Sequence, residues 1–186
     1  MIDAVDERSD GELARLVLDG EKRAFDAIVL RHKLALYRIV VRLTGDDDDA
    51  LDIVQEAFVA AHQALRRYDP ARPMRAWLTR IAVNKARDWR RRRAVRRFVA
   101  VFLPIDEGLE VSAPQPSPEV QAADREELAK VTAAISMLPA NLAEVLVLRA
   151  IEGQSQAEAA DALGISEKAV ETRLYRARRR LSALRG

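Results

Sequence analysis

Hydrophobic residues recur every three or four positions along most of this chain, which is the spacing of an amphipathic helix. In the first half the pattern predicts helices over residues 10–19, 21–43, 50–67 and 75–97. In the second half it predicts helices over 124–138, 140–152, 155–163 and 167–180. No segment shows the strict alternation of a half-buried strand, so we expect an all-α fold.

The last two predicted helices have the pattern of a helix-turn-helix. Ser155 and Glu158 can form a capping box at the first, and Gly164 suits the left-handed residue that ends it. Ser166 can cap the second helix, which carries one apolar stripe and a polar face flanked by arginines. Such a helix can lie in a major groove, with polar side chains on base edges and arginines on phosphates. The candidate DNA-binding residues are Lys168, Glu171, Thr172, Arg173, Tyr175, Arg176 and Arg179.

Two further polar faces appear in the first half of the chain. The helix over 50–67 has an apolar stripe that includes Leu51, Val54 and Phe58. Its opposite side carries Asp52, Gln55 and Glu56, and their spacing alone leaves open whether this face is solvated or binds a partner. The helix over 75–97 has an outer face made of Arg80, Asn84, Arg87 and Arg91.

The helical pattern stops between residues 102 and 123, where prolines are interspersed with acidic residues. This composition predicts an extended, flexible tether. We therefore expect two small helical domains, over residues 1–98 and 124–186, joined by an acidic linker over 99–123.

Charge and composition narrow the possible functions. The formal net charge is only +2, but the basic residues gather around 85–97 and in the C-terminal helix, which suggests two contacts with one polyanion. Cysteine is absent and the two histidines have no third ligand nearby, so we expect no metal and no cofactor. No apolar run approaches the roughly 20 residues that cross a bilayer, and the first residues are acidic and polar. We expect a cytoplasmic protein with no stable membrane insertion.

Three segments together resemble a group IV, extracytoplasmic-function sigma factor of the sigma-70 family. They are DALDIVQEAF at residues 49–58, WLTRIAVN at 77–84 and AVETRLYRAR at 169–178, in this order and on either side of a tether. The resemblance implies a sigma region 2-like domain and a sigma region 4-like domain. It also implies a promoter-specificity subunit that is not an enzyme. Such a protein binds core RNA polymerase through its clamp and flap regions, recognises −35 DNA as duplex and captures the −10 strand during opening.

The resemblance also suggests roles for individual residues. Asp49, Asp52, Gln55 and Glu56 would meet the clamp helices of the largest polymerase subunit. Tyr68 and Asn84 would lie beside a pocket for an extruded −10 base, for which an aromatic wall and an amide are suitable groups. The remaining candidates for −10 DNA are Arg80, Lys85, Arg87 and Arg91. An anti-sigma factor is a further expected partner.

Several alternatives stay open at this point. A conventional helix-turn-helix regulator would also bind DNA, although such proteins are ordinarily dimeric and no dimer helix is evident. A sigma-like decoy for an anti-sigma factor is a second alternative, disfavoured because both DNA surfaces look intact. The linker is either a plain tether or a segment that threads through the polymerase. Many members of the family carry a basic residue where this chain has Glu171. Either this chain lacks the phosphate contact that the basic residue would make, or Glu171 binds a cytosine amino group instead.

Overall fold

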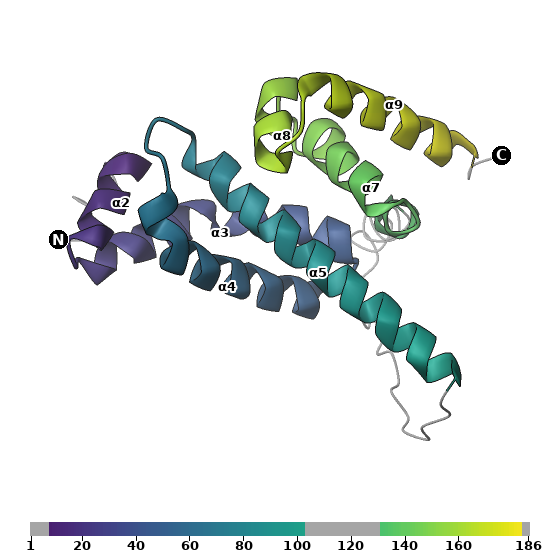
Figure 1. Ribbon diagram of the computed structural model, residues 1–186, viewed down its shortest axis with the longest axis horizontal. Coiled ribbons are helices and arrows are strands. Elements are labelled where there is room, and N and C mark those ends of the chain that lie inside the picture. The colour runs from purple at the N-terminus through teal and green to yellow at the C-terminus, as the bar shows by residue number, and fades with distance from the viewer. Residues whose placement is uncertain (1–7, 103–130, 184–186) are drawn as a thin grey trace, which may run out of the picture.

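The computed structural model of the chain describes residues 8–102 and 131–183, and every regular element within these ranges is helical (Figure 1). The first half contains α2 (Asp10–Leu18), α3 (Lys22–Thr44), α4 (Asp47–Ala64), the short 3₁₀ turn η1 (Leu65–Arg67) and α5 (Met74–Phe102). In the second half, residues 131–136 are helical and are followed by α7 (Ala140–Leu146), the π turn η2 (Val147–Ile151), α8 (Gln156–Leu163) and α9 (Glu167–Ala183). The expected all-α fold is confirmed over the described residues.

The core of the first half lies between α3, α4 and α5, which pack against one another. Large apolar side chains on their facing sides are almost fully buried, including Ile28, Leu36, Phe58 and Leu78. The rings of Phe58 and Phe25 meet edge to face with their centroids 6.4 Å apart, an arrangement that the quadrupoles of aromatic rings favour.

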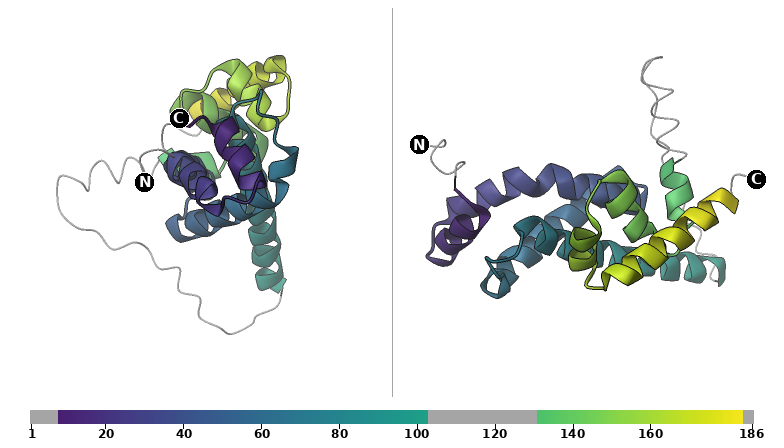
Figure 2. Two further views of the ribbon diagram at one scale, coloured as in Figure 1. Left: turned by 90° about the vertical axis from the view of Figure 1, so that its left-hand side faces the viewer. Right: turned by 90° about the horizontal axis from the view of Figure 1, so that it is seen from above.

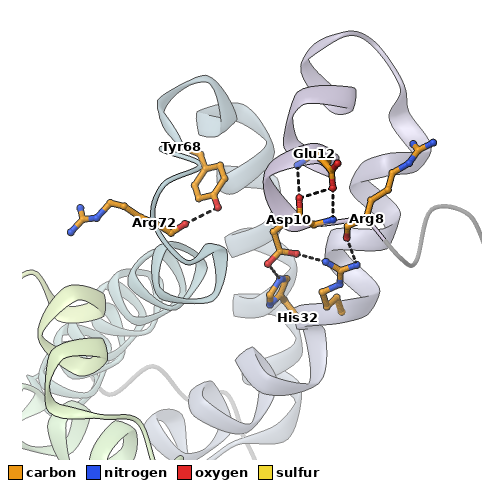
Figure 3. A network of polar contacts seen from close by, with 8 residues as sticks. Arg8, Asp10, Glu12, His32, Tyr68 and Arg72 are labelled. Carbon is orange, nitrogen blue, oxygen red and sulfur yellow. Dashed lines mark hydrogen bonds and ion pairs between the residues drawn. The ribbon is translucent and has the colours of Figure 1, made fainter.

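Figure 3 shows the polar contacts that hold α2 against α3. Ser9 and Glu12 form a capping box at the start of α2. Asp10 accepts a hydrogen bond from Arg31 at 2.6 Å, and its other carboxylate oxygen lies 3.1 Å from Nε2 of His32. His32 is only 7% exposed, so it is a packed histidine as expected. Among the described residues no group of three or more His, Cys, Asp or Glu side chains could hold a metal ion.

The start of α4 falls within the run of four aspartates, at Asp47 rather than at residue 50 as predicted. Asp46 caps the helix by accepting a hydrogen bond from the backbone N–H of Asp49 at 3.0 Å. Carboxylates in the first turn are favoured because the helix dipole is positive there. The Tyr37 hydroxyl donates to Asp47 at 2.6 Å, and this hydrogen bond raises the pKa of Tyr37 to about 12.

The prediction that Leu51 belongs to the buried stripe of α4 is wrong. The buried residues of this helix are Ala50, Ile53, Val54, Ala57, Phe58 and Ala61. Leu51 is instead 39% exposed, because it lies at the edge of this stripe beside the polar face.

The second half differs from its prediction in one element. A single helix was expected over residues 140–152, but α7 ends at Leu146 and the π turn η2 follows. The two caps and the turn of the helix-turn-helix are confirmed: Ser155 and Glu158 form the capping box, Gly164 has a φ of 65°, and Ser166 caps α9 through the N–H of Ala169 at 3.2 Å.

The two halves pack against each other. α8 lies along α5, while α7 and η2 meet α3 (Figures 1 and 2). The buried apolar residues of both halves form one continuous cluster. The predicted domain boundary at residue 98 falls within α5, which continues to Phe102, and residues 103–123 of the predicted linker lie outside the described residues. No helix in the described part of the chain is long and apolar enough to cross a membrane.

Candidate functional site

The first candidate surface lies on α4. Asp52, Gln55 and Glu56, called the α4 outer face below, are all exposed. They line an open hollow of about 440 Å³ together with Val59, which is 57% exposed. Lys85 reaches the same hollow from α5, with its ammonium group 3.1 Å from the carboxylate of Glu56. Exposed carboxylates around an apolar patch suit contact with a basic protein surface.

Asp49 belongs to α4 but not to this outer face. Its carboxylate accepts a hydrogen bond from the indole N–H of Trp89 at 2.8 Å and pairs with Arg93 at 3.2 Å. The Arg93 guanidinium also lies over the Trp89 ring, 4.8 Å from its centroid. Asp49 therefore holds the start of α4 on α5, whereas the other three predicted polymerase-binding residues point outward.

Tyr68 is largely covered in this arrangement. Tyr68 directly follows η1 in the sequence and is 9% exposed. Its hydroxyl donates a hydrogen bond to the carbonyl oxygen of Arg72 at 2.8 Å (Figure 3). The ring packs on Trp77 with the centroids 5.2 Å apart. Burial raises the pKa of Tyr68, and the nearby charges of Asp10 and Asp69 raise it further. A ring this covered offers little surface on which a base could stack.

Four predicted −10 contacts share one side of α5. We call Arg80, Asn84, Arg87 and Arg91 the α5 basic face. Arg87 donates to both carboxylate oxygens of Glu144 at 2.6 and 2.5 Å and to the side-chain oxygen of Asn84 at 3.0 Å. The hydrogen bonds to Glu144 raise the pKa of Arg87. Arg91 pairs with Asp88 at 3.3 Å.

Arg80 lies against the turn of the helix-turn-helix. This turn favours glycine for its φ of 65°, and a β-carbon there would come within 3.1 Å of the Arg80 guanidinium, which would have to shift slightly. Arg80 and Arg72 line an open hollow of about 410 Å³ with Asp161 and Glu167. Of the predicted −10 residues, Lys85 is set apart from this side of α5, because it pairs with Glu56.

α9 presents the predicted −35 residues. It packs on α7 and α8, and lies on the side of the second half away from α5 (Figure 1). The helix buries Val170 and Ala177 fully. The predicted contacts on its other faces are exposed or half-buried: Lys168, Glu171, Thr172, Arg173, Tyr175, Arg176 and Arg179. Glu171 pairs with Lys168 at 2.8 Å.

The contacts between the two halves involve polar residues that the sequence pattern did not single out. Glu144 is 1% exposed and Glu152 has a side chain that is 4% exposed, and both are paired with arginines of the first half. Arg90 donates to the carbonyl oxygens of Ser136 and Leu138, at 3.2 and 3.0 Å. The sequence did contain one indication that Glu144 is paired, because it is the one acidic residue in the apolar run over residues 142–148.

Comparison with known protein families matches each half separately. Residues 28–96 match Sigma-70 region 2, and residues 128–181 match Sigma-70 region 4. The first match contains the α4 outer face and the α5 basic face, and the second contains the helix-turn-helix.

Individual relatives agree with the family matches. RNA polymerase sigma factor CnrH of Cupriavidus metallidurans is 46% identical over 182 residues, which cover 96% of this chain and 95% of that protein. ECF RNA polymerase sigma factor SigE of Mycolicibacterium smegmatis is 34% identical, with 94% of this chain and 68% of that protein covered.

Solved structures of such proteins have the same fold. The structure of CnrH in complex with the cytosolic domain of CnrY gives a TM-score of 0.68 at 40% identity, covering 94% of this chain and 96% of that one. The sigma factor RpoE in complex with the anti-sigma factor NepR, from Bartonella quintana, gives 0.63 at 25% identity, covering 86% and 95%.

Proposed function

This chain belongs to the sigma-70 family of RNA polymerase sigma factors, in its extracytoplasmic-function group, and we propose that its surfaces divide promoter recognition among α4, α5 and α9. It acts by binding, not as an enzyme. The observation that carries the proposal is α9, a capped helix with an exposed basic face on the outer side of the region 4 half.

The α4 outer face is the proposed contact with the clamp of core polymerase. Its support is the exposure of all three side chains around one open hollow. Lys85 shares this hollow through its pair with Glu56, so polymerase groups that attract Glu56 also release Lys85 for DNA. The region 4 half is proposed to meet the flap.

α9 is the proposed reader of −35 duplex DNA. Arg173, Arg176 and Arg179 are placed to neutralise phosphates, and Thr172 and Tyr175 to approach base edges. Glu171 is proposed to accept a hydrogen bond from a cytosine amino group, and its pair with Lys168 would open on binding.

α5 is the proposed surface for the −10 strand, with Asn84 as the group that pairs with an extruded base. Arg80, Lys85, Arg87 and Arg91 would hold the strand's backbone. Tyr68 would wall the base pocket once its covered ring becomes exposed, which includes breaking the bond of its hydroxyl to the Arg72 carbonyl.

An anti-sigma factor is a proposed third partner. CnrH in a complex with the cytosolic domain of CnrY, and RpoE in one with the anti-sigma factor NepR, are each similar to this chain in structure over most of its length. We place the protein in the cytoplasm, where its polymerase and its promoters are.

Reconstituted transcription tests the proposal. Core polymerase with this protein should produce discrete transcripts from a library of genomic fragments, and their mapped start sites define the −10 and −35 elements. Asn84→Ala should then lower permanganate reactivity of the −10 bases on duplex promoters while core affinity stays unchanged.

A matched control is Asp26→Ala, an exposed residue of α3 outside all proposed surfaces. It should leave transcript yield unchanged. Specific DNA binding without any core-dependent transcript would instead favour a conventional helix-turn-helix regulator.

A further inference from the structure

The amide side chain of Asn84 has a fixed orientation on α5. Its oxygen accepts a hydrogen bond from Nη1 of Arg87 at 3.0 Å. The two residues lie three positions apart on one helix, the spacing at which side chains face each other. A guanidinium carries only N–H donors, so it can meet the oxygen of an amide but not its NH2 group. The partner therefore settles which end of the Asn84 amide faces Arg87.

Arg87 is itself held in place while it donates to Asn84. Its Nε and Nη2 atoms donate to the two carboxylate oxygens of Glu144, at 2.6 and 2.5 Å. The Glu144 side chain is 2% exposed, whereas that of Arg87 is 38% exposed. Hydrogen bonds on both edges leave the guanidinium little freedom to turn. Glu144 stiffens this arrangement, but the bond between Arg87 and Asn84 lies within α5 and needs no second segment.

The NH2 group of Asn84 is the end of the amide that stays available. Asn84 is exposed, and within residues 8–102 and 131–183 its side chain forms only the hydrogen bond with Arg87. The carboxylate of Asp88, one turn further along α5, is paired with Arg91 at 3.3 Å. Nδ2 of Asn84 therefore has both of its N–H donors free for a ligand on the outer side of α5.

A free donor beside an occupied acceptor distinguishes among the bases. Thymine, cytosine and guanine each have a carbonyl oxygen on the edge that pairs in a duplex, whereas adenine has an amino group and ring nitrogens. An asparagine reads adenine through two hydrogen bonds, which use its oxygen as well as its NH2 group. The Asn84 oxygen has a second lone pair, but an adenine amino group that used it would approach beside the donors of a charged guanidinium. A base carbonyl meets no such conflict.

We propose that Arg87 is a positioning residue for base recognition: it holds the Asn84 oxygen and thereby presents the Asn84 NH2 group to the extruded −10 base. A base with a carbonyl oxygen is then preferred to adenine at the position that Asn84 reads. This inference rests on the proposed role of α5 and adds the chemistry of the base that α5 selects. Arg87 acts on the base through Asn84, in addition to the backbone contact proposed for it.

Transcription by core polymerase with the full-length protein measures this preference. Premelted templates carry each of the four bases in turn at every −10 position of the captured strand, so strand separation does not enter the comparison. Asn84→Ala first identifies the position, because base preference should disappear there and persist elsewhere. At that position the base preferred by the wild type should carry a carbonyl oxygen and exceed adenine by about five- to a hundredfold, the range that one good base contact gives.

Two substitutions test the orientation of the amide. Arg87→Met has a similar stem but no donors, so the Asn84 amide can rotate and offer either end to a base. The preference over adenine should then be largely lost. Asn84→Asp places an oxygen at both ends of the side chain, so Arg87 holds one oxygen and the other faces the base as an acceptor. This variant should favour adenine over thymine, which has no amino group.

Arg91→Met is the matched control. It removes the same charge from the same face of α5, at a residue whose ion pair is with Asp88 and not with Asn84. It should weaken transcription from all four templates alike, as the loss of a backbone contact does. If Arg87→Met also weakened all four alike and kept the wild-type preference, Arg87 would hold only the backbone and the proposal would be overturned. A wild-type preference for adenine at the position of Asn84 would overturn it as well.

The stability of the variants is checked by their Tm. Arg87→Met leaves the carboxylate of Glu144 buried without its partner, which is strongly destabilising. If that protein does not fold, Arg87→Met combined with Glu144→Met takes its place, because the double variant removes both charges. The same comparison among the four bases then applies.

The two proposals fail separately in these assays. If Asn84→Ala changes base preference at no −10 position while transcripts are still produced, the base-reading role of α5 is rejected, and this inference with it. If Asn84→Ala removes the preference at one position but Arg87→Met does not, only the positioning by Arg87 is rejected and the proposed function stands.

Discussion

Replacing Asp49 tests whether this residue serves the fold or the polymerase contact. It lies one helical turn before Asp52, and both were expected to meet core polymerase. Asp49→Ala removes a hydrogen bond from Trp89 at 2.8 Å to a charged acceptor, and such bonds contribute about 1.5–3 kcal/mol. It also removes the ion pair with Arg93, which contributes about 0.2–1 kcal/mol because the Asp49 side chain is 36% exposed.

The two contributions sum to about 1.7–4 kcal/mol, and we expect about 2–3 kcal/mol because the site is partly solvated. For a chain of this size each kcal/mol lowers Tm by about 2–4 °C, so we expect a fall of roughly 4–12 °C. Asp52→Ala is the control, since its exposed side chain should change the free energy of unfolding by less than about 0.5 kcal/mol.

A double-mutant cycle isolates the hydrogen bond. Trp89→Phe keeps an aromatic ring but lacks the N–H, so Asp49→Ala should cost less in that background. The measurements are urea unfolding for stability and a binding titration with core polymerase well below Tm. Asp49→Ala should retain most of its core affinity and Asp52→Ala should not. Wild-type stability of Asp49→Ala, or no coupling to Trp89, would refute the structural role.

Four other predictions address the remaining surfaces and the core. Alanine at all three positions of the α4 outer face should weaken core binding with nearly unchanged Tm; unaltered affinity in a titration would reject the contact. Arg176→Ala should lower the slope of log affinity for −35 duplex against log salt by about one, as measured by fluorescence anisotropy. Phe58→Ala should lose about 3–5 kcal/mol in urea unfolding, since Phe58 is only 6% exposed. The pKa of Tyr37 is raised by its bond to Asp47, so its stabilising contribution is complete below pH 10 and is lost as the pH rises through about 12. In an absorbance titration, Tyr37→Phe should remove the tyrosine that ionises near pH 12 and leave Tyr68, whose pKa is also raised, in place.

The sequence predicted best what local contacts determine. The capping box of Ser155 and Glu158 and the left-handed Gly164 involve neighbours within a few residues, so their spacing is sufficient to identify them. The outward direction of the α4 outer face followed from helical periodicity in the same way.

The sequence predicted poorly what depends on partners far along the chain. Glu144 meets Arg87 across 57 positions and Arg42 meets Glu152 across 110, and no periodicity reports such a pair. Asp49 was assigned to the polymerase contact by the resemblance alone, and no local pattern indicated its hydrogen bond with Trp89 on another helix. The π turn after Leu146 was also missed, because an i→i+5 turn in an apolar run has the same composition as a continuing α-helix.

The different surroundings of α5 and α9 determine how freely each can change during evolution. Most side chains on the outer side of α9 are exposed, so a substitution there should change the proposed contact with upstream DNA at little cost to the fold. If Arg87 holds the −10 strand as proposed, a substitution there must suit both that strand and Glu144. Lineages of this protein should therefore diversify their −35 preferences one residue at a time. A change at Arg87 that alters its hold on the −10 strand needs a compensating change in the region 4 half.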